Sequence, residues 1–299
     1  MRKPYRSPLF YVGDKYKLYP AISESFPADI NKFIEPFAGG GSVFLNVKAR
    51  RYLINDIDSN VINLHNFLQQ SAADPAAFFK AVAEKIEHYG LSRSYAADIV
   101  PLALKKQYVK TYYAKFNKTG FNQLKADYNA AEEKDPLLLY LLLIFGFNRM
   151  LRFNANFKYN LPVGNVDFNK NVRKALEDYF RLTQEKQPEM HNEDFVAFLD
   201  KIDYAPGDFV YADPPYLLTF SEYNKLWNEE EEKRLLQKLD ELAAQGVKFA
   251  VSNITHYKGK VNDLFLAWST RYQCREIKSN YISYHDNSNK SFREVLVSS

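Results

Sequence analysis

Apolar and polar positions divide the chain into three stretches. In the first and last, short runs of β-branched and aromatic residues alternate with amphipathic segments, which predicts parallel strands joined by helices. The middle stretch instead has the apolar spacing of helices, clearest at residues 61–70, 75–88 and 137–147. We therefore expect an α/β fold whose sheet is interrupted by a mostly helical insert. The expected division is residues 1–57, 58–190 and 191–299.

One segment of the expected insert has neither helical nor strand periodicity. Residues 154–171 are rich in asparagine, and basic residues alternate with aromatic ones here and just before. The pattern indicates a long loop, and loops of this length usually serve a function. Basic side chains suit phosphates, and aromatic rings stack on bases or wedge between them. The alternative is a solvated surface loop. Our candidates for nucleic-acid contact are Arg149, Arg152, Asn154 and Lys158.

The most informative stretch follows the strand expected at residues 209–212. It is the tetrapeptide Asp213-Pro214-Pro215-Tyr216. Proline cannot donate to a sheet, so the strand ends here and backbone carbonyls stay free to accept hydrogen bonds. A carboxylate, a free carbonyl and an aromatic ring together suit an exocyclic amino group on a flat ring. The tetrapeptide therefore predicts a methyl-transfer site, the alternative being a strand followed by a proline-rich turn.

A second motif lies near the amino terminus, where a short apolar strand runs into Gly39-Gly40-Gly41 and a helix-competent segment. Glycines permit a tight turn and close backbone approach to a ligand. The next apolar run, residues 52–55, ends at Asp56, the usual position for a group that binds ribose hydroxyls. This arrangement favours an adenosine-bearing cofactor. Because the glycine spacing is not that of a dinucleotide site, S-adenosylmethionine is favoured over a nicotinamide dinucleotide. A plain strand-to-helix turn is the alternative.

Composition agrees with these motifs. The chain has 299 residues, 46% of them hydrophobic, which suffices for a substantial core. Its net charge of +4 is compatible with nucleic acid. The single cysteine, Cys274, excludes an intrachain disulfide, and the five histidines lack metal-ligand spacing, so we expect no metal. No apolar run reaches the length of a membrane span, and the basic start lacks a signal-peptide core, so we expect a cytoplasmic protein.

With both motifs in view, the chain resembles the Dam family of DNA adenine N6-methyltransferases nearly from end to end, most closely the phage type. The matching stretches are residues 11–15, 35–42, 55–56, 135–140, 146–154, 213–227 and 246–253. Cofactor motifs, a long insert and then the catalytic tetrapeptide is the order of the alpha group of amino-methyltransferases. The resemblance implies a Rossmann-like S-adenosylmethionine-dependent methyltransferase fold with an inserted, mostly helical target-recognition domain. It also implies double-stranded DNA as the partner.

The resemblance also implies which residues contact the cofactor. By position they are Tyr11, Lys15, Phe37, Gly39, Asp56, Asp194, Phe195, Asp213 and Tyr223. Taken alone, Tyr11 and Phe37 would be core aromatics and Asp194 a helix cap. Asp14 departs from the family, which often has glycine or asparagine there. The acidic run at residues 229–232 is left out of the site, because it has the pattern of a solvated helix start.

The expected mechanism uses neither a covalent intermediate nor a metal. An adenine would rotate out of the duplex, its amino group donating to Asp213 and the Pro214 carbonyl and its ring stacking on Tyr216. Arg152 resembles the family arginine that reads a guanine beside the target adenine, whereas Arg149 is an alternative phosphate contact. GATC is our first expectation for the site. Residues 156–164 differ from the form common in relatives, which is where an altered specificity would lie.

Two other functions remain open from the sequence. The same fold acts on cytosine N4 or on RNA in other enzymes, although Asp213 favours adenine because cytosine N4 enzymes often have serine there. A catalytically silent nucleic-acid-binding protein is the weaker alternative, since it would not need both motifs. We expect a monomer, acting alone or beside a cognate restriction endonuclease.

Overall fold

The computed structural model describes residues 3–97, 99–219, 227–277 and 292–299. Its described strands form one sheet in the order β3-β2-β1-β4-β5-β8-β7, with β6 paired to β5. β3, β2, β1, β4 and β5 pair in parallel, whereas β8 runs antiparallel to both of its neighbours. The strands are β1 (Lys32–Glu35), β2 (Arg51–Asn55), β3 (Glu189–His191), β4 (Phe209–Ala212), β5 (Lys248–Tyr257), β6 (Lys260–Val261), β7 (Gln273–Ile277) and β8 (Arg293–Ser298). This mostly parallel sheet confirms the expected Rossmann-like α/β fold.

Side chains of the central strands alternate between two apolar cores, as the period of a β-strand requires. In β1, Phe33 joins one core and Ile34 the other. In β4, Tyr211 and Ala212 divide in the same way. Both faces of the sheet are therefore covered, which explains why its strands read as continuous apolar runs in the sequence.

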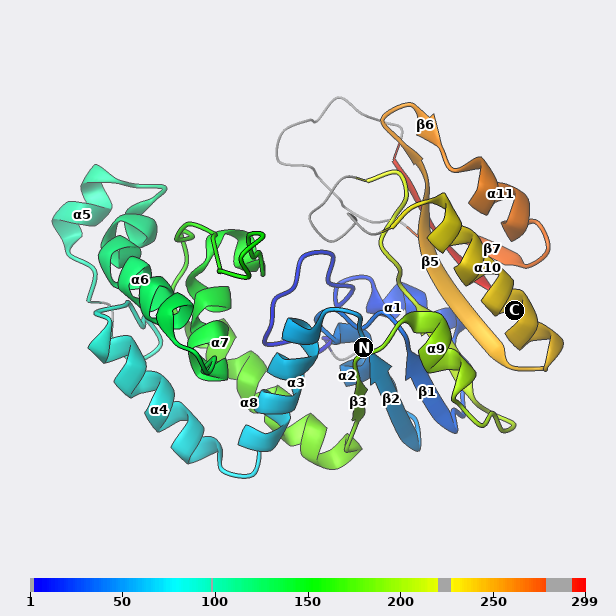
Figure 1. Cartoon of the computed structure of the whole chain (residues 1–299), viewed down its shortest axis with the longest axis horizontal. Coiled ribbons are helices and arrows are strands. Elements are labelled where there is room, and N and C mark those ends of the chain that lie inside the picture. Colours follow the sequence, from blue (N-terminus) through cyan, green and yellow to red (C-terminus); the bar gives the residue numbers. More distant parts are fainter. Residues whose placement is uncertain (1–2, 98, 220–226, 278–291) are drawn as a thin grey trace.

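Helices cover both faces of the sheet (Figure 1). The helices α9, α10 and α11 bury their apolar sides in one core, while α2, α3 and α8 contribute to the other. The helices are α1 (Tyr19–Ile22), α2 (Ser42–Asn46), α3 (Ser59–Ser71), α4 (Pro75–His88), α5 (Leu102–Gln107), α6 (Tyr112–Ala130), α7 (Pro136–Phe145), α8 (Lys170–Lys186), α9 (Phe195–Asp200), α10 (Glu229–Ala244) and α11 (Asp263–Ser269), with 3-10 turns η1 (Ser23–Ser25) and η2 (Phe147–Arg149).

The helices α4 to α7 form a lobe beside the sheet, at the left of Figure 1. Two of them begin with the same device, an aspartate cap followed by proline. Asp74 accepts a hydrogen bond from Ala77 N at 2.9 Å, and Asp135 accepts one from Leu137 N at 2.8 Å. Proline lacks the N–H that a first helical position leaves unused, so it fits there without loss. The α7 helix is buried along its length, as predicted for a core helix.

The three helices expected in the insert are present as α3, α4 and α7. The β3 strand pairs with β2, so the sheet takes up the chain again at Glu189, slightly before the expected boundary at residue 191. Within the described residues, no helix combines the length and the apolar composition that crossing a bilayer requires.

Candidate active site

Asp213 lies directly beyond the carboxyl end of β4, at the edge where ligands bind in sheets of this kind. Its Oδ2 is 2.9 Å from the Lys15 ammonium, and its Oδ1 accepts a hydrogen bond of 2.8 Å from the Tyr216 hydroxyl. The lysine side chain is only 4% exposed, whereas the aspartate side chain remains 18% exposed. Asp213 is therefore held in one orientation and still reaches solvent, as a carboxylate that meets a substrate must.

A second carboxylate, Glu294 of β8, completes this cluster and was not expected from the sequence. Its Oε1 accepts from the Tyr216 hydroxyl at 3.1 Å and lies 3.7 Å from the Lys15 nitrogen. The side chain is fully buried, and its Oε2 has no hydrogen-bond partner. Lys15 is thus the cation shared by two carboxylates that the chain supplies 81 residues apart, at Asp213 and Glu294.

Tyr216 lies between these charges. Burial, followed by the charges of Asp213 and Glu294, raises the pKa of Tyr216 well above its ordinary value, so its hydroxyl keeps the proton that it donates. The Lys15 ammonium lies 5.1 Å from the centre of the ring, within the range of a cation–π contact. Tyr216 is 9% exposed, so most of its ring is packed against protein.

Glu35, at the end of β1, adds a third carboxyl group near this cluster, and it is buried. It accepts a hydrogen bond of 3.2 Å from Phe44 N. Burial, and then the neighbouring charge of Asp213, raises the pKa of Glu35 well above its ordinary value. Acidic side chains therefore gather at the carboxyl ends of β1 and β4. Among the described residues, Lys15 pairs with the carboxylates of this cluster.

The glycine loop between β1 and α2 has the backbone that only glycine adopts readily. Gly39 and Gly41 have φ values of +47° and +72°. A Cβ on Gly41 would lie 2.3 Å from the Phe44 ring, and one on Gly40 would lie 2.8 Å from the Tyr11 Cβ. Tyr11 therefore packs directly on the loop, and the loop leaves no room for side chains on this side.

Asp56 connects the second strand to this loop. Its Oδ2 accepts from Gly39 N at 2.7 Å and its Oδ1 from Asp58 N at 2.9 Å. Burial raises the pKa of Asp56 to about 6, although the backbone donors oppose the shift. Next to it, the Asn55 amide donates to the Pro36 and Glu193 carbonyls at 3.1 and 3.0 Å. Asn55 thereby fixes the segment that carries Asp194 and Phe195 beside the loop.

Three aromatic rings gather next to this segment. The Phe37 ring is 5.1 Å from that of Phe195 and 5.5 Å from that of Trp227, in an edge-on arrangement. The Trp227 indole N–H donates to Glu232 at 2.7 Å. Glu232 is fully buried and also accepts from the side-chain amides of Asn253 and Asn262. The prediction of a solvated acidic run was therefore wrong for Glu232, because its side chain orients this aromatic cluster.

Asp194 caps α9, accepting hydrogen bonds from Val196 N at 3.1 Å and Ala197 N at 3.3 Å. It also forms an ion pair of 2.8 Å with Arg234. The cap role weighed from the sequence is thus present, and the carboxylate remains partly exposed beside Phe195. Tyr223, another expected cofactor contact, lies outside the described residues.

The residues around the glycine loop fit an adenosine-bearing cofactor. Asp56 reaches the loop through its hydrogen bond from Gly39 N, and the Phe37 ring packs on Phe195 next to the same loop. Burial raises the pKa of Asp14, although hydrogen bonds from Ser42 and Tyr16 N oppose the shift. A carboxylate and an aromatic cluster beside a bare backbone turn match the polar and flat parts of a nucleoside.

The expected recognition residues divide into two places. Arg152, Asn154 and Lys158 lie on a short hairpin closed by an antiparallel bridge between Phe153 and Tyr159. Arg152 Nε donates to Asn160 Oδ1 at 2.8 Å, and Asn154 N donates to Lys158 O at 2.9 Å. The hairpin is thus an ordered part of the stretch that was expected to be a long loop.

Arg149 lies apart from that hairpin. Its guanidinium carbon is 4.0 Å from the centre of the Phe10 ring, and its Nε is buried without a hydrogen-bond partner. Burial lowers the pKa of Arg149 to about 10.

At the hairpin itself, Phe157 is 85% exposed and has a φ of +55°, an uncommon backbone for a bulky residue. The most exposed aromatic ring of the hairpin is therefore at its tip.

Comparison with known proteins identifies the class of this site. The model of the D12 class of N6 adenine-specific DNA methyltransferases matches residues 11–295, almost the whole chain. The chain belongs to this family. The predicted resemblance to DNA adenine methyltransferases is thereby confirmed.

Several relatives of this chain are named as methylases or methyltransferases. The modification methylase StsI of Streptococcus sanguinis is 32% identical over 310 residues, covering 99% of this chain and 43% of the relative. The type II methyltransferase M.FokI of Planomicrobium okeanokoites is 33% identical, covering 98% of this chain and 42% of its own. A DNA adenine methylase of Haemophilus influenzae is 28% identical over 70% of this chain. The chain thus spans less than half the length of the first two relatives.

Proposed function

We propose that this D12 methyltransferase transfers a methyl group from S-adenosylmethionine to the N6 amino group of an adenine rotated out of duplex DNA. The observation that carries the proposal is the position of the Asp213 carboxylate. It is partly exposed beyond the carboxyl end of β4 and is held by Lys15 and Tyr216. The proposal concerns the chain as given, which covers only part of its longer relatives.

The four residues of the tetrapeptide act together in this proposal. The Asp213 carboxylate and the Pro214 carbonyl accept hydrogen bonds from the amino group, which draws the nitrogen lone pair out of conjugation with the ring. Pro215 ends the strand and Tyr216 fixes the carboxylate through its hydroxyl. When bound, S-adenosylmethionine supplies a methyl group activated by a positively charged sulfur. Asp213 or a water molecule takes the proton that the amino nitrogen releases.

We further propose which residues bind the cofactor. Asp56 accepts from the ribose hydroxyls, while Phe37 and Phe195 pack on the adenine ring, and Gly39 allows the backbone to approach. Tyr11 supports the loop by packing on it. Lys15 contributes by orienting Asp213. Asp194 and Tyr223 keep the cofactor roles implied by the family resemblance.

This assignment predicts a dependence of cofactor affinity on pH. The pKa of Asp56 is raised to about 6 in the folded protein, so protonation below that pH removes the carboxylate that accepts from ribose. We expect the Kd for S-adenosylmethionine to be constant above about pH 7 and to rise about tenfold per pH unit well below the Asp56 pKa. Titration calorimetry between pH 5 and pH 8 measures this.

The stability of the cofactor-free protein should change with pH in the direction opposite to that of the cofactor affinity. Because the pKa of Asp56 is raised on folding, its contribution to stability is present at low pH and is lost as the pH rises through about 6. The Asp56→Asn variant should bind S-adenosylmethionine weakly, and its Kd should not change with pH between pH 5 and pH 8. If the Kd of Asp56→Asn rose at low pH as it does in the wild type, the pH dependence would belong to another group.

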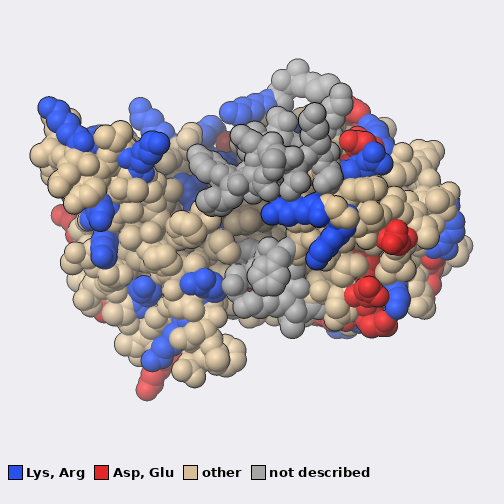
Figure 2. Space-filling model, turned by 90° about the horizontal axis from the view of Figure 1, so that it is seen from above, with Lys and Arg blue, Asp and Glu red and all other residues tan. Residues whose placement is uncertain are grey.

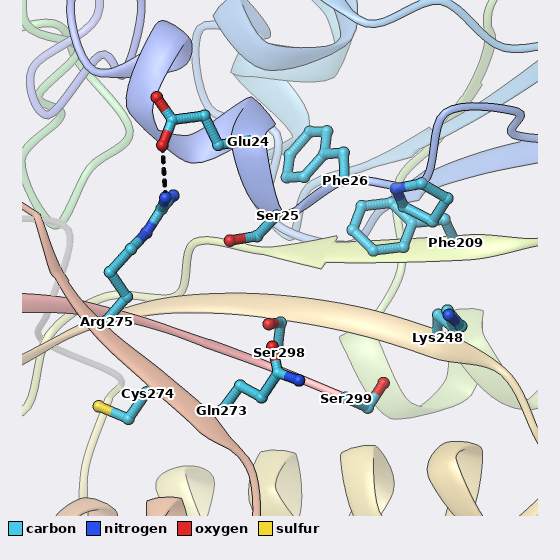
Figure 3. Close-up of a pocket in the computed structure, with 11 residues that line it drawn as sticks. Glu24, Ser25, Phe26, Phe209, Lys248, Gln273, Cys274, Arg275, Ser298 and Ser299 are labelled. Carbon is cyan, nitrogen blue, oxygen red and sulfur yellow. Dashed lines mark hydrogen bonds and ion pairs between the residues drawn. The ribbon is translucent and has the colours of Figure 1, made fainter.

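For DNA, we propose that residues 58–190 form the target-recognition domain, with Arg152, Asn154 and Lys158 contacting the duplex. Residues 99–126 of this lobe contain six lysines and neither aspartate nor glutamate. Figure 2 looks onto the lobe from above, and blue side chains are spread over its visible face while red ones are few. Such a surface suits the phosphates on both sides of a target base. A GATC site, a monomeric state and a cognate restriction endonuclease complete the proposal.

Base recognition by Arg152 gives a further prediction. Replacing Arg152 with alanine should reduce discrimination against a changed base beside the target adenine by about tenfold or more, because a bidentate arginine–guanine pair contributes about 1–3 kcal/mol. Competition between duplexes that differ at that base measures the ratio of kcat/KM values. Lys158→Ala is the matched control, and it should weaken all duplexes alike. Unchanged selectivity in Arg152→Ala would move recognition to residues 156–165.

The proposed activity is tested by following labelled methyl groups from S-adenosylmethionine into defined nucleic acids. Duplex DNA containing GATC should be labelled, whereas the same duplex with all of its adenines replaced should not be labelled. Labelling of RNA but not of duplex DNA would overturn the choice of substrate. Cofactor binding without transfer to any nucleic acid would support the inactive binding protein instead.

A further inference from the structure

One fully buried histidine contacts the cofactor loop and is not explained by the proposed chemistry. His65 lies on α3, and its Nε2 is 2.9 Å from the carbonyl oxygen of Gly39. Its Nδ1 is 2.9 Å from the Tyr179 hydroxyl of α8. The two rings are stacked, with centroids 5.9 Å apart. Both ring nitrogens are therefore engaged, each by a different part of the chain.

The partners determine where the proton of this imidazole lies. A backbone carbonyl can only accept, so Nε2 carries the hydrogen and donates to Gly39, and Nδ1 accepts from Tyr179. Burial lowers the pKa of His65 to about 4, so the ring stays neutral at physiological pH. The Gly39 carbonyl thereby selects the tautomer, and the Tyr179 hydroxyl completes it by donating to Nδ1.

Gly39 is thus held at both of its peptide groups. Its N–H donates to Asp56 at 2.7 Å, while its carbonyl accepts from His65. The residue has a φ of +47°, so these contacts hold a backbone conformation that an unrestrained chain would populate only in part. A Cβ on Gly41 would lie 3.1 Å from the His65 ring, which shows that the imidazole packs closely on the same turn.

We propose that His65 is a positioning residue for the cofactor loop, and that Tyr179 acts through it by holding the imidazole ring at Nδ1. The inference rests on the proposed function, because it assigns the loop to S-adenosylmethionine. His65 acts through Gly39 and need not touch the cofactor itself. The loop is then preorganised before binding, so the free energy of binding is not spent on ordering it.

This positioning also connects two regions of the molecule. The α8 helix begins at Lys170, within the stretch of residues 154–171 that was expected to be a loop, and carries Tyr179 two and a half turns later. The helix α3 carries His65 on the other side of the contact. Both helices fall within residues 58–190, and both contribute to the core on one face of the sheet.

Three variants test the proposal. His65→Leu removes the donor to Gly39 and should raise the Kd for S-adenosylmethionine about tenfold or more, because a buried carbonyl is left unsatisfied. His65→Gln offers an amide N–H in place of Nε2–H and should restore most of the affinity. Tyr179→Phe should have an intermediate effect, about two- to fivefold. Titration calorimetry gives each Kd, and thermal unfolding shows that each variant is folded.

A second measurement needs no cofactor. Amide hydrogen exchange in the cofactor-free protein should be faster for the peptide spanning residues 36–46 in His65→Leu than in the wild type, and close to wild type in His65→Gln. A role in stability alone would lower the melting temperature of His65→Leu while leaving the Kd and the relative exchange of this peptide unchanged, which would overturn the inference. Failure of the wild-type protein to bind S-adenosylmethionine would instead overturn the proposed function.

Discussion

Replacing Asp213 with alanine is expected to reduce methyl transfer to adenine about a thousandfold, because groups aligned with the charge that develops in a transition state contribute about 10²–10³ in kcat. The carboxylate is held by Lys15 at 2.9 Å and by the Tyr216 hydroxyl at 2.8 Å, so both of its oxygens are fixed in position. Single-turnover rates with saturating duplex DNA and S-adenosylmethionine measure the loss directly.

The matched variant is Asp213→Asn, which keeps one oxygen acceptor and most of the shape. We expect it to retain more activity than Asp213→Ala and less than the wild type. Both variants should bind S-adenosylmethionine and duplex DNA with affinities within about fivefold of the wild type, because the carboxylate contacts the amino group most strongly during transfer. Turnover near the wild-type rate in Asp213→Ala would remove this residue from the chemistry.

Replacing Lys15 with methionine should damage both stability and activity. The ammonium is only 4% exposed and serves Asp213 and Glu294 together, so its loss leaves two carboxylates facing each other without a cation. Removing one partner of a buried ion pair typically costs about 3–5 kcal/mol. Denaturant unfolding should show a loss of this order, and kcat should fall because Asp213 loses the contact that orients it.

The second carboxylate provides the control for Lys15→Met. Adding Glu294→Gln to Lys15→Met removes one of the two carboxylates left without a cation and should recover part of the lost stability. The activity should recover less, since Asp213 still lacks its lysine. If Lys15→Met were as stable as the wild type, the charge cluster would not have the energetic role assigned to it.

Much of the catalytic half of the molecule could be predicted from local sequence. The parallel strands β1, β2 and β4 are buried on both faces and appear as short apolar runs. Each is followed by the residues that carry the site, because a strand end, a glycine turn and a proline pair all leave local signals. Asp56 and Asp213 were identified for this reason.

The supporting residues could not be predicted in the same way. Glu294 lies on β8 within an ordinary strand pattern, and only the pairing of β8 with β5 brings it to Lys15. Glu232 stands in a run of four glutamates, and its partners Asn253 and Asn262 come from elements later in the chain. His65 reads as a helical position like any other. Buried polar partners arise from tertiary contacts, which periodicity does not encode.

Identification of the methylated nucleoside distinguishes the proposed activity from its alternatives. The purified protein is incubated with S-adenosylmethionine and unmethylated duplex DNA, the DNA is digested to nucleosides, and the methylated product is identified by mass spectrometry, with Asp213→Ala in parallel. We expect N6-methyldeoxyadenosine from the wild type and almost none from the variant. N4-methyldeoxycytidine as the sole product, or equal yields from both proteins, would contradict this expectation.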